Sequence, residues 1–367
     1  MPSQSSEMVG IVSRHQELLD SYKNSEIAKL RPFLREIRAE VIDKLSDEDL
    51  TALSRRKFNK LLALINKNLT SIYNRMGSEL AESLDELAIS EAAFEAKTFE
   101  TAVDVDLDLP SPNQLHSAAF NNPMTGRGAA GGILLTPFMN KISNDSRNIL
   151  IREIRNGYAQ GLTTDQIIRR VVGTKTRLFN DGAILHSKRY LELMVRTSVQ
   201  HLSAQARERT WQANKDIVKG VRWNSTLDSH TSKLCMSLDG QFFKHNEGPR
   251  PPAHIGCRSS VIAELSDRYD FLKEGRTRFA RKIDADGNEI KSSATSVNAN
   301  QTYYDWIKNQ PTSFQNWRLG PSRAKLLRNG GLTSRRFAEL QLGKNFNILT
   351  LEQMRKLEPL AFEKAGV

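Results

Sequence analysis

Two cysteines and a histidine within one short stretch are of the residue types that bind a transition metal. Cys235, His254 and Cys257 offer two thiolates and one imidazole, the ligands that a tetrahedral zinc site takes. His254 and Cys257 stand three residues apart, a spacing at which two side chains of a tight turn can hold one ion. The three residues therefore predict a structural zinc site, and zinc is the one cofactor that the sequence indicates.

The fourth ligand of such a site stays open in the sequence. His230, His245 and Asp228 are the candidates, and His230 is included in the predicted ligand set. The alternative is a compact loop without a metal, in which Pro252 and hydrogen bonds hold two buried, reduced cysteines. Two cysteines form no disulfide framework, so they could be free thiols, one bridge or two of four metal ligands.

The same residues allow a catalytic interpretation. A Cys235–His254 pair would need an orienting acid such as Asp228 or Asp239 to work as a hydrolase. Arg258 next to Cys257 would favour a thiolate. No protease signature accompanies these residues, and no Ser-His-Asp elbow, HExxH or paired glycosidase carboxylates occur in the chain. We therefore expect a binding protein and no enzyme.

Short strands and turns must position these side chains. Residues 221–223, which contain Trp223, resemble a strand, and Asp239-Gly240 separates them from a second short strand at 241–243. Prolines, among them Pro252, end regular structure before Arg258. We expect a small α+β core around 215–262, held by the packing and hydrogen bonds of Trp223, Asp239, Gly240, Pro252 and Arg258.

The rest of the chain has mainly helical patterns. Apolar residues at helical spacing predict three N-terminal helices, with a helix start at 46–49. Further helices are expected over 141–175, with a cap at Thr163 or Thr164, over 186–214, and again in the tail from residue 302. Asp286-Gly287 predicts a hairpin turn.

These patterns give a mainly α protein with a small α+β core. We predict an N-terminal helical docking region at 1–105, followed by a linker and glycine-rich loop at 106–140. A central domain at 141–265 and an extended hairpin with a helical C-terminal tail at 266–367 follow. The glycine-rich loop lacks a Gly-Lys-Ser/Thr sequence and a preceding strand, so it does not predict a nucleotide site.

The balance of charge favours contact with a polyanion. The formal net charge is +11 and the isoelectric point is about 9.6. No base-reading module occurs, so contact with double-stranded DNA should be non-specific, with Arg55, Arg56, Arg196 and Arg207 as candidate residues. No run of about 18 apolar residues and no secretory signal occur, so we expect no membrane partner and synthesis in the cytoplasm of a host cell.

The chain resembles the Mu-F-like head morphogenesis family of tailed phages. That family shows an Arg-Thr helix, a strand with Trp, a Cys-x-x-Cys-x-x-Leu-Asp-Gly segment and a Pro-Pro-x-His-x-x-Cys-Arg-Cys segment. Its counterparts here are Val195-Arg196-Thr197, the 221–223 strand, Leu238-Asp239-Gly240 and the segment from Pro251 to Arg258. Ser232 and Ser259 stand where the family often has cysteines, which leaves Cys235, His254 and Cys257 for a metal.

The resemblance covers about residues 140–262, with weaker likenesses at 122–126 and in the tail. It implies a minor head protein, present in few copies at or near the portal vertex inside the capsid. Its expected partners are the portal protein, the major capsid protein and packaged DNA, and its expected role is in head assembly and in DNA packaging or ejection. Some relatives carry toxin or transferase-like domains. The rival hypothesis is therefore an enzyme in the particle, either a Cys-His hydrolase or a transferase that uses Arg196 and a nearby Glu.

Overall fold

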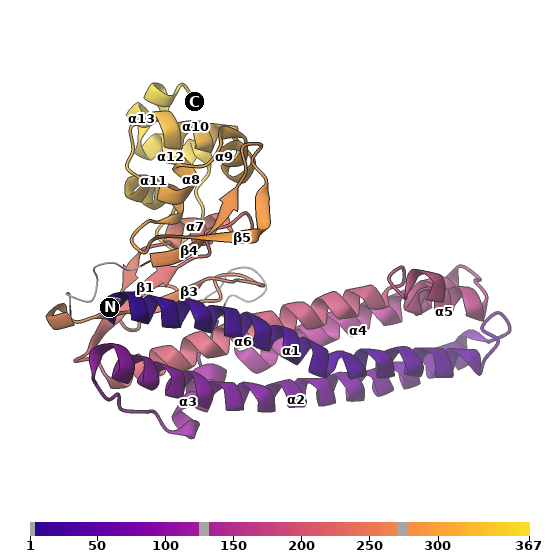
Figure 1. The fold of residues 1–367 in the computed structure, drawn as a ribbon. Coiled ribbons are helices and arrows are strands. Elements are labelled where there is room, and N and C mark those ends of the chain that lie inside the picture. Colours follow the sequence, from indigo (N-terminus) through magenta and orange to yellow (C-terminus); the bar gives the residue numbers. More distant parts are fainter. Residues whose placement is uncertain (1–3, 125–131, 270–276) are drawn as a thin grey trace.

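Two long antiparallel helices form one half of an elongated bundle (Figure 1). The computed structural model describes residues 4–124, 132–269 and 277–367. Helix α1 covers Gln4–Ser46 and helix α2 covers Arg55–Val103, so each is roughly 65 to 75 Å long at about 1.5 Å per residue. The second and third predicted helices are this one continuous helix α2.

The predicted helix start at residues 46–49 is wrong. Helix α1 ends at Ser46, and α2 begins only after Ser54, whose hydroxyl accepts a hydrogen bond from the Lys57 amide. Residues between them form the turn that reverses the chain, and Asp49 binds the Thr51 amide there instead of capping a helix. The acidic and polar composition that resembled a cap thus belongs to the turn.

Four further helices complete the bundle. Helix α3 (Pro112–Phe120) lies within the predicted linker, and the long helices α4 (Leu135–Ala159) and α6 (Ile184–Ala213) pack along α2. Helix α5 (Thr164–Val172) begins with the expected cap, since Thr163 and Gln166 form a reciprocal capping box. One apolar core joins residues of α1 and α2 to residues of α4, α5 and α6. Residues 125–131 of the predicted glycine-rich loop lie outside the described residues.

A three-stranded antiparallel sheet follows the bundle. Its order is β2 (Phe242–Phe243), β1 (Val218–Asn224) and β3 (Ser260–Leu265), with Trp223 opposite Val261. The short helix α7 (Lys233–Leu238) connects β1 to β2. One face of the sheet forms a second apolar core with Trp211 and the end of α2. The sequence predicted β1 and β2 but not β3.

The C-terminal part begins with the hairpin β4 (Thr277–Ile283) and β5 (Glu289–Asn298), which turns at the predicted Asp286-Gly287. Six short helices with a core of their own follow, as the helical tail predicted (yellow and orange in Figure 1). They are α8 (Tyr303–Lys308), α9 (Thr312–Leu319), α10 (Pro321–Asn329), α11 (Ser334–Leu340), α12 (Leu351–Leu357) and α13 (Pro359–Ala365).

The predicted fold class, mainly α with a small α+β core, is confirmed. No helix formed by the described residues has both the length and the apolar character that crossing a membrane requires.

Candidate metal centre and the contacts that brace it

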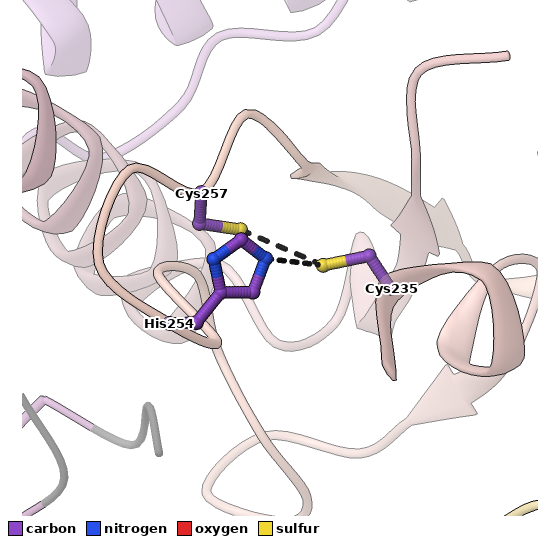
Figure 2. A group of neighbouring side chains, drawn as sticks. All are labelled: Cys235, His254 and Cys257. Carbon is purple, nitrogen blue, oxygen red and sulfur yellow. Dashed lines mark hydrogen bonds between the residues drawn. The ribbon is translucent and has the colours of Figure 1, made fainter. Parts of the chain in front are cut away.

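The two cysteines and the histidine meet in the structure as the sequence predicted they should for a metal site (Figure 2). Cys235 comes from helix α7, whereas His254 and Cys257 come from the loop between β2 and β3. The Cys235 Sγ lies 3.4 Å from His254 Nε2 and 3.7 Å from Cys257 Sγ. All three ligand atoms lie within 4.8 Å of one another, which is the size of a shell around one small cation.

Hydrogen bonds divide the protons of this cluster unequally. The Nδ1 of His254 bonds the Ile255 carbonyl, so Nδ1 carries a hydrogen and Nε2 is the nitrogen that faces the sulfur atoms. Hydrogen bonds from Cys235 and His254 hold the pKa of Cys257 well below its usual value. The hydrogen bond to Cys257 and burial hold the pKa of Cys235 well above its usual value, so this thiol donates to a Cys257 thiolate.

The donor set fits zinc, but it is one ligand short. Of the three candidates for a fourth ligand, none belongs to the described cluster of donors within 4.8 Å. The Asp228 carboxylate binds Arg258, and His245 lies between Glu208 and the Val218 carbonyl. His230 is exposed at a separate cleft of about 530 Å³, which Asp228 and Arg258 also line.

Two serine hydroxyls stand beside the cluster instead. Ser232 caps helix α7 by accepting a hydrogen bond from the Cys235 amide, and Ser259 follows Cys257 by two residues. Both hydroxyls lie close enough to the Cys235 thiol to oppose the rise in its pKa. At these two positions the chain has serine where the Cys-rich pattern has cysteine. The structure therefore places both serines next to Cys235, His254 and Cys257.

Asp239 connects this site to three parts of the chain. Its buried carboxylate accepts hydrogen bonds from the Ser225 and Tyr303 amides, both at 2.7 Å, and pairs with Arg278 from strand β4. Gly240 follows with a φ of +80°, and its amide donates to the Trp223 carbonyl. A side chain at Gly240 would be strained and would approach Thr302 to 2.9 Å, which explains the Asp-Gly pair.

Trp223 and Arg258 brace the site from its other sides. The buried Trp223 indole donates to Ser225, whose hydroxyl in turn donates to the Cys235 carbonyl. Arg258 forms a 2.6 Å ion pair with Asp228, which also accepts the amides of His230 and Thr231. Trp223 and Arg258 therefore hold helix α7 and the residues that lead into it in place.

Arg250 and Glu208 fasten the loop before the metal ligands to helix α6, and sequence reasoning did not single out either. Arg250 is buried and donates to both carboxylate oxygens of Glu208 at 3.1 Å. Both nitrogens of His245 face acceptors, Glu208 and the Val218 carbonyl, an arrangement that favours the doubly protonated ring. Hydrogen bonding to Glu208 accordingly raises the pKa of His245. The predicted Pro252 lies in the same loop, and its peptide bond with Pro251 is cis.

Comparison with known proteins identifies the segment that contains this site. Residues 148–262 match the family model described as Phage Mu protein F like protein. This segment is similar to phage Mu protein F, and we refer to it as the Mu F-like domain. The match runs from the middle of α4 to strand β3 and includes the whole Cys-His-Cys cluster, whereas α1, α2 and the C-terminal helices lie outside it. It confirms the resemblance and indicates a phage head morphogenesis protein. No curated protein and no solved structure matches the chain.

The four arginines predicted to contact DNA differ in their exposure to solvent. Arg55 and Arg56 are exposed at the start of α2, and Arg196 bonds Asn24 of α1. Arg207 is only 3% exposed and forms an ion pair with the equally buried Glu95, whose other oxygen binds Trp211. The guanidinium of Arg207 therefore belongs to the interior of the bundle and does not reach phosphate at the surface.

Proposed function

We propose that this protein is a minor head protein of a tailed phage. In this proposal it is made in the host cytoplasm and lies in few copies at or near the portal vertex, inside the capsid. There it assists head assembly and the packaging or ejection of DNA. The single observation that carries the proposal is the Mu F-like domain at residues 148–262.

The geometry of that domain favours a scaffold. Ion pairs join its loops to a helix of the bundle and to the C-terminal hairpin: Arg250 to Glu208 on α6, and Asp239 to Arg278 on β4. Such contacts fix one arrangement of the bundle, the sheet and the C-terminal helices, which is what a part of a large assembly needs. In this scheme a zinc ion at Cys235, His254 and Cys257 adds a further crosslink between α7 and the β2–β3 loop.

The shape of the molecule suggests which part contacts which partner. Helices α1 and α2 form an arm that extends far beyond the sheet (Figure 1). We assign to this N-terminal arm the contact with the portal protein or the major capsid protein. The net charge of +11 supports an additional, non-specific contact with packaged double-stranded DNA.

Composition of the particle tests the proposal. Purified virions should contain this chain at a few copies per particle, and cryo-electron microscopy should locate it at the portal vertex. Heads produced without it should be misassembled or poorly filled, and the intact gene supplied in trans should restore them. Virions that lack the chain while wild-type infection produces it would refute the proposal.

The DNA contact needs its own measurement. The logarithm of the binding constant for a random-sequence duplex should fall linearly with the logarithm of the salt concentration, because each neutralised phosphate releases a counterion. Affinity should not depend on the duplex sequence. Absence of binding at low salt would remove the DNA contact and leave the assembly role intact.

The enzyme alternative rests on the 3.4 Å contact between Cys235 and His254. Against it, both thiols are 1% exposed, and His254 Nδ1 bonds a backbone carbonyl where an orienting carboxylate would be needed. None of the three residues lines the 530 Å³ cleft. A Cys235→Ala variant that assembles normally but loses a measured hydrolase or transferase rate would favour the enzyme.

A further inference from the structure

The loop between helices α5 and α6 holds two consecutive large residues in a backbone conformation that such residues rarely adopt. Leu178 has a φ of +50° and Phe179 a φ of +59°. This left-handed region brings a β-carbon close to the backbone and is strongly unfavourable for bulky side chains. The conformation persists only if the surroundings impose it, and such outliers cluster at functional sites.

The surroundings here do impose it. The Asp181 carboxylate closes the loop by accepting the amide and the hydroxyl of Thr174, both at 2.7 Å. Gly182 approaches so closely that an added β-carbon would lie 2.2 Å from the Gly173 nitrogen. Phe179 packs against the bundle core, and the Arg38 guanidinium stacks over its ring at 4.3 Å.

This closed loop turns the Leu178 side chain outward. Leu178 is 79% exposed, more than any other large hydrophobic residue among those described. A single exposed leucine needs no explanation by itself. An exposed leucine in a strained loop does need an explanation, because asparagine or glycine would adopt the same backbone at lower cost.

Charge around Leu178 indicates what it contacts. Lys175 and Arg177, in the 3₁₀ turn just before it, are exposed. The turn between α1 and α2 lies at the same end of the bundle, where Thr164 of α5 bonds the Glu48 carbonyl (Figure 1). That turn exposes three carboxylates, Asp47, Glu48 and Asp49, and the start of α2 beside it exposes three cations, Arg55, Arg56 and Lys57.

The exposed arginines at this end could pair with the phosphates of a duplex, but a leucine side chain gains nothing from phosphate and is buried only in an apolar pocket. A protein pocket of leucine size offers this burial, and carboxylates at its rim can reach Lys175 and Arg177. We propose that Leu178 is the anchor of a docking site for another protein of the particle, which offers an apolar pocket with an acidic rim. This inference rests on the proposed function and names the part of the molecule that makes the contact.

Site-specific photocrosslinking tests it in the whole chain. A photoreactive amino acid replaces Leu178 during infection, and the matched control carries it at Leu360, which is 77% exposed on α13. Position 178 should crosslink to one different protein of the assembling head, and position 360 should not crosslink to that protein. Adducts at 178 with DNA alone or with another copy of this chain, or no adduct, would overturn the proposal.

A Leu178→Asn variant separates docking from folding, because asparagine tolerates the left-handed backbone. Its Tm should equal or exceed that of the wild type, while its incorporation into heads should fall at least tenfold. Leu360→Asn should be incorporated normally. Normal incorporation of Leu178→Asn would contradict the anchor role, and so would a reduced Tm, which would mark Leu178 as a structural residue.

The outcomes also separate this inference from the proposed function. If wild-type particles contain the chain but position 178 crosslinks to no other head protein, the anchor role fails and the minor head function stands. If purified particles lack the chain altogether, both fail.

Discussion

Arg278 on strand β4 donates hydrogen bonds to both carboxylate oxygens of Asp239, at 2.9 and 3.1 Å. The pair is buried, and Arg278 also donates to the carbonyls of Ser225 and Gln301. A bidentate pair of this kind fixes direction as well as distance. It therefore joins the end of the Mu F-like sheet to the hairpin that leads into the C-terminal helices.

Replacement of Asp239 by Ala should lower the free energy of unfolding by about 3 to 5 kcal/mol, because Arg278 would remain buried without its partner. Urea denaturation followed by Trp fluorescence measures this loss, since Trp223 lies in the adjoining core. The control is Arg335→Ala, which breaks the exposed pair with Glu339 and should cost about 0.5 kcal/mol or less. Equal losses in the two variants would show that the Asp239 pair has no special role.

The local part of this site could be predicted from the sequence. Cys235, His254 and Cys257 lie within one short stretch, so their types and spacing were enough to group them. Asp239 and Gly240 were also recognisable, because an Asp-Gly pair after an apolar run is typical of a turn. The partner of Asp239 was not, since Arg278 comes from a hairpin whose position depends on tertiary packing.

The continuity of α2 and the strand β3 were not predicted either, because contacts between residues distant in the sequence determine both. The sequence predicted two helices over the residues of α2, yet Met76 and Leu80 are both buried in the core and keep the helix continuous across Gly77. Packing there outweighs the roughly 1 kcal/mol that glycine costs in a helix. Strand β3 shows no simple alternation, because its Glu264 is buried in a fork with Arg222 across the sheet.

Zinc binding should depend on Cys257 and should strengthen when a missing ligand is restored. We expect the reduced chain to bind about one zinc ion and Cys257→Ser to lose it, because the thiolate is a ligand. Ser259→Cys should bind zinc roughly tenfold tighter or more, since its side chain lies beside Cys235 and would supply a fourth ligand. Competition with a chromophoric chelator measures both affinities.

The control for the zinc experiment is Ser266→Cys, which adds a thiol directly after strand β3, outside the Cys-His-Cys cluster. It should leave the affinity for zinc unchanged. Equal zinc affinities for the wild type, Cys257→Ser and Ser259→Cys would rule out the cluster as a metal site.

His201 should make the bundle sensitive to acid. Burial lowers the pKa of His201 to about 4, and its Nε2 bonds the Ala119 carbonyl. A histidine that is neutral when folded stabilises the protein fully above its unfolded pKa of about 6.5, and this stability is lost as the pH falls towards 4. The loss should reach about 3 kcal/mol, since each pKa unit corresponds to about 1.4 kcal/mol.

A His201→Gln variant isolates this contribution, because glutamine keeps a donor for Ala119 but does not titrate. Urea denaturation at pH 7 and pH 4 gives the pH-dependent loss for each protein. The wild type should lose about 3 kcal/mol more than the variant over this interval. Parallel losses in both proteins would mean that His201 is protonated equally in the folded and unfolded chains.

Substitutions at the buried Arg207 and at the exposed Arg55 and Arg56 should change different properties. The first should lower stability, and the second should lower DNA affinity. Arg207→Gln leaves the buried Glu95 without its ion partner and should cost about 3 kcal/mol or more of unfolding free energy. Its affinity for duplex DNA, measured at a temperature where the variant is folded, should match the wild type because the side chain does not reach the surface. Arg55→Gln combined with Arg56→Gln should leave stability within about 0.5 kcal/mol.

The slope of DNA affinity against salt decides whether the start of α2 contacts phosphate. If both arginines do so, the double variant should bind more weakly, and the slope of log K against log salt should fall by about 2. An unchanged slope would place the DNA contact elsewhere on the basic surface. A reduced slope in Arg207→Gln would instead mean that the bundle opens when it binds DNA, because a side chain buried against Glu95 has no other way to neutralise a phosphate.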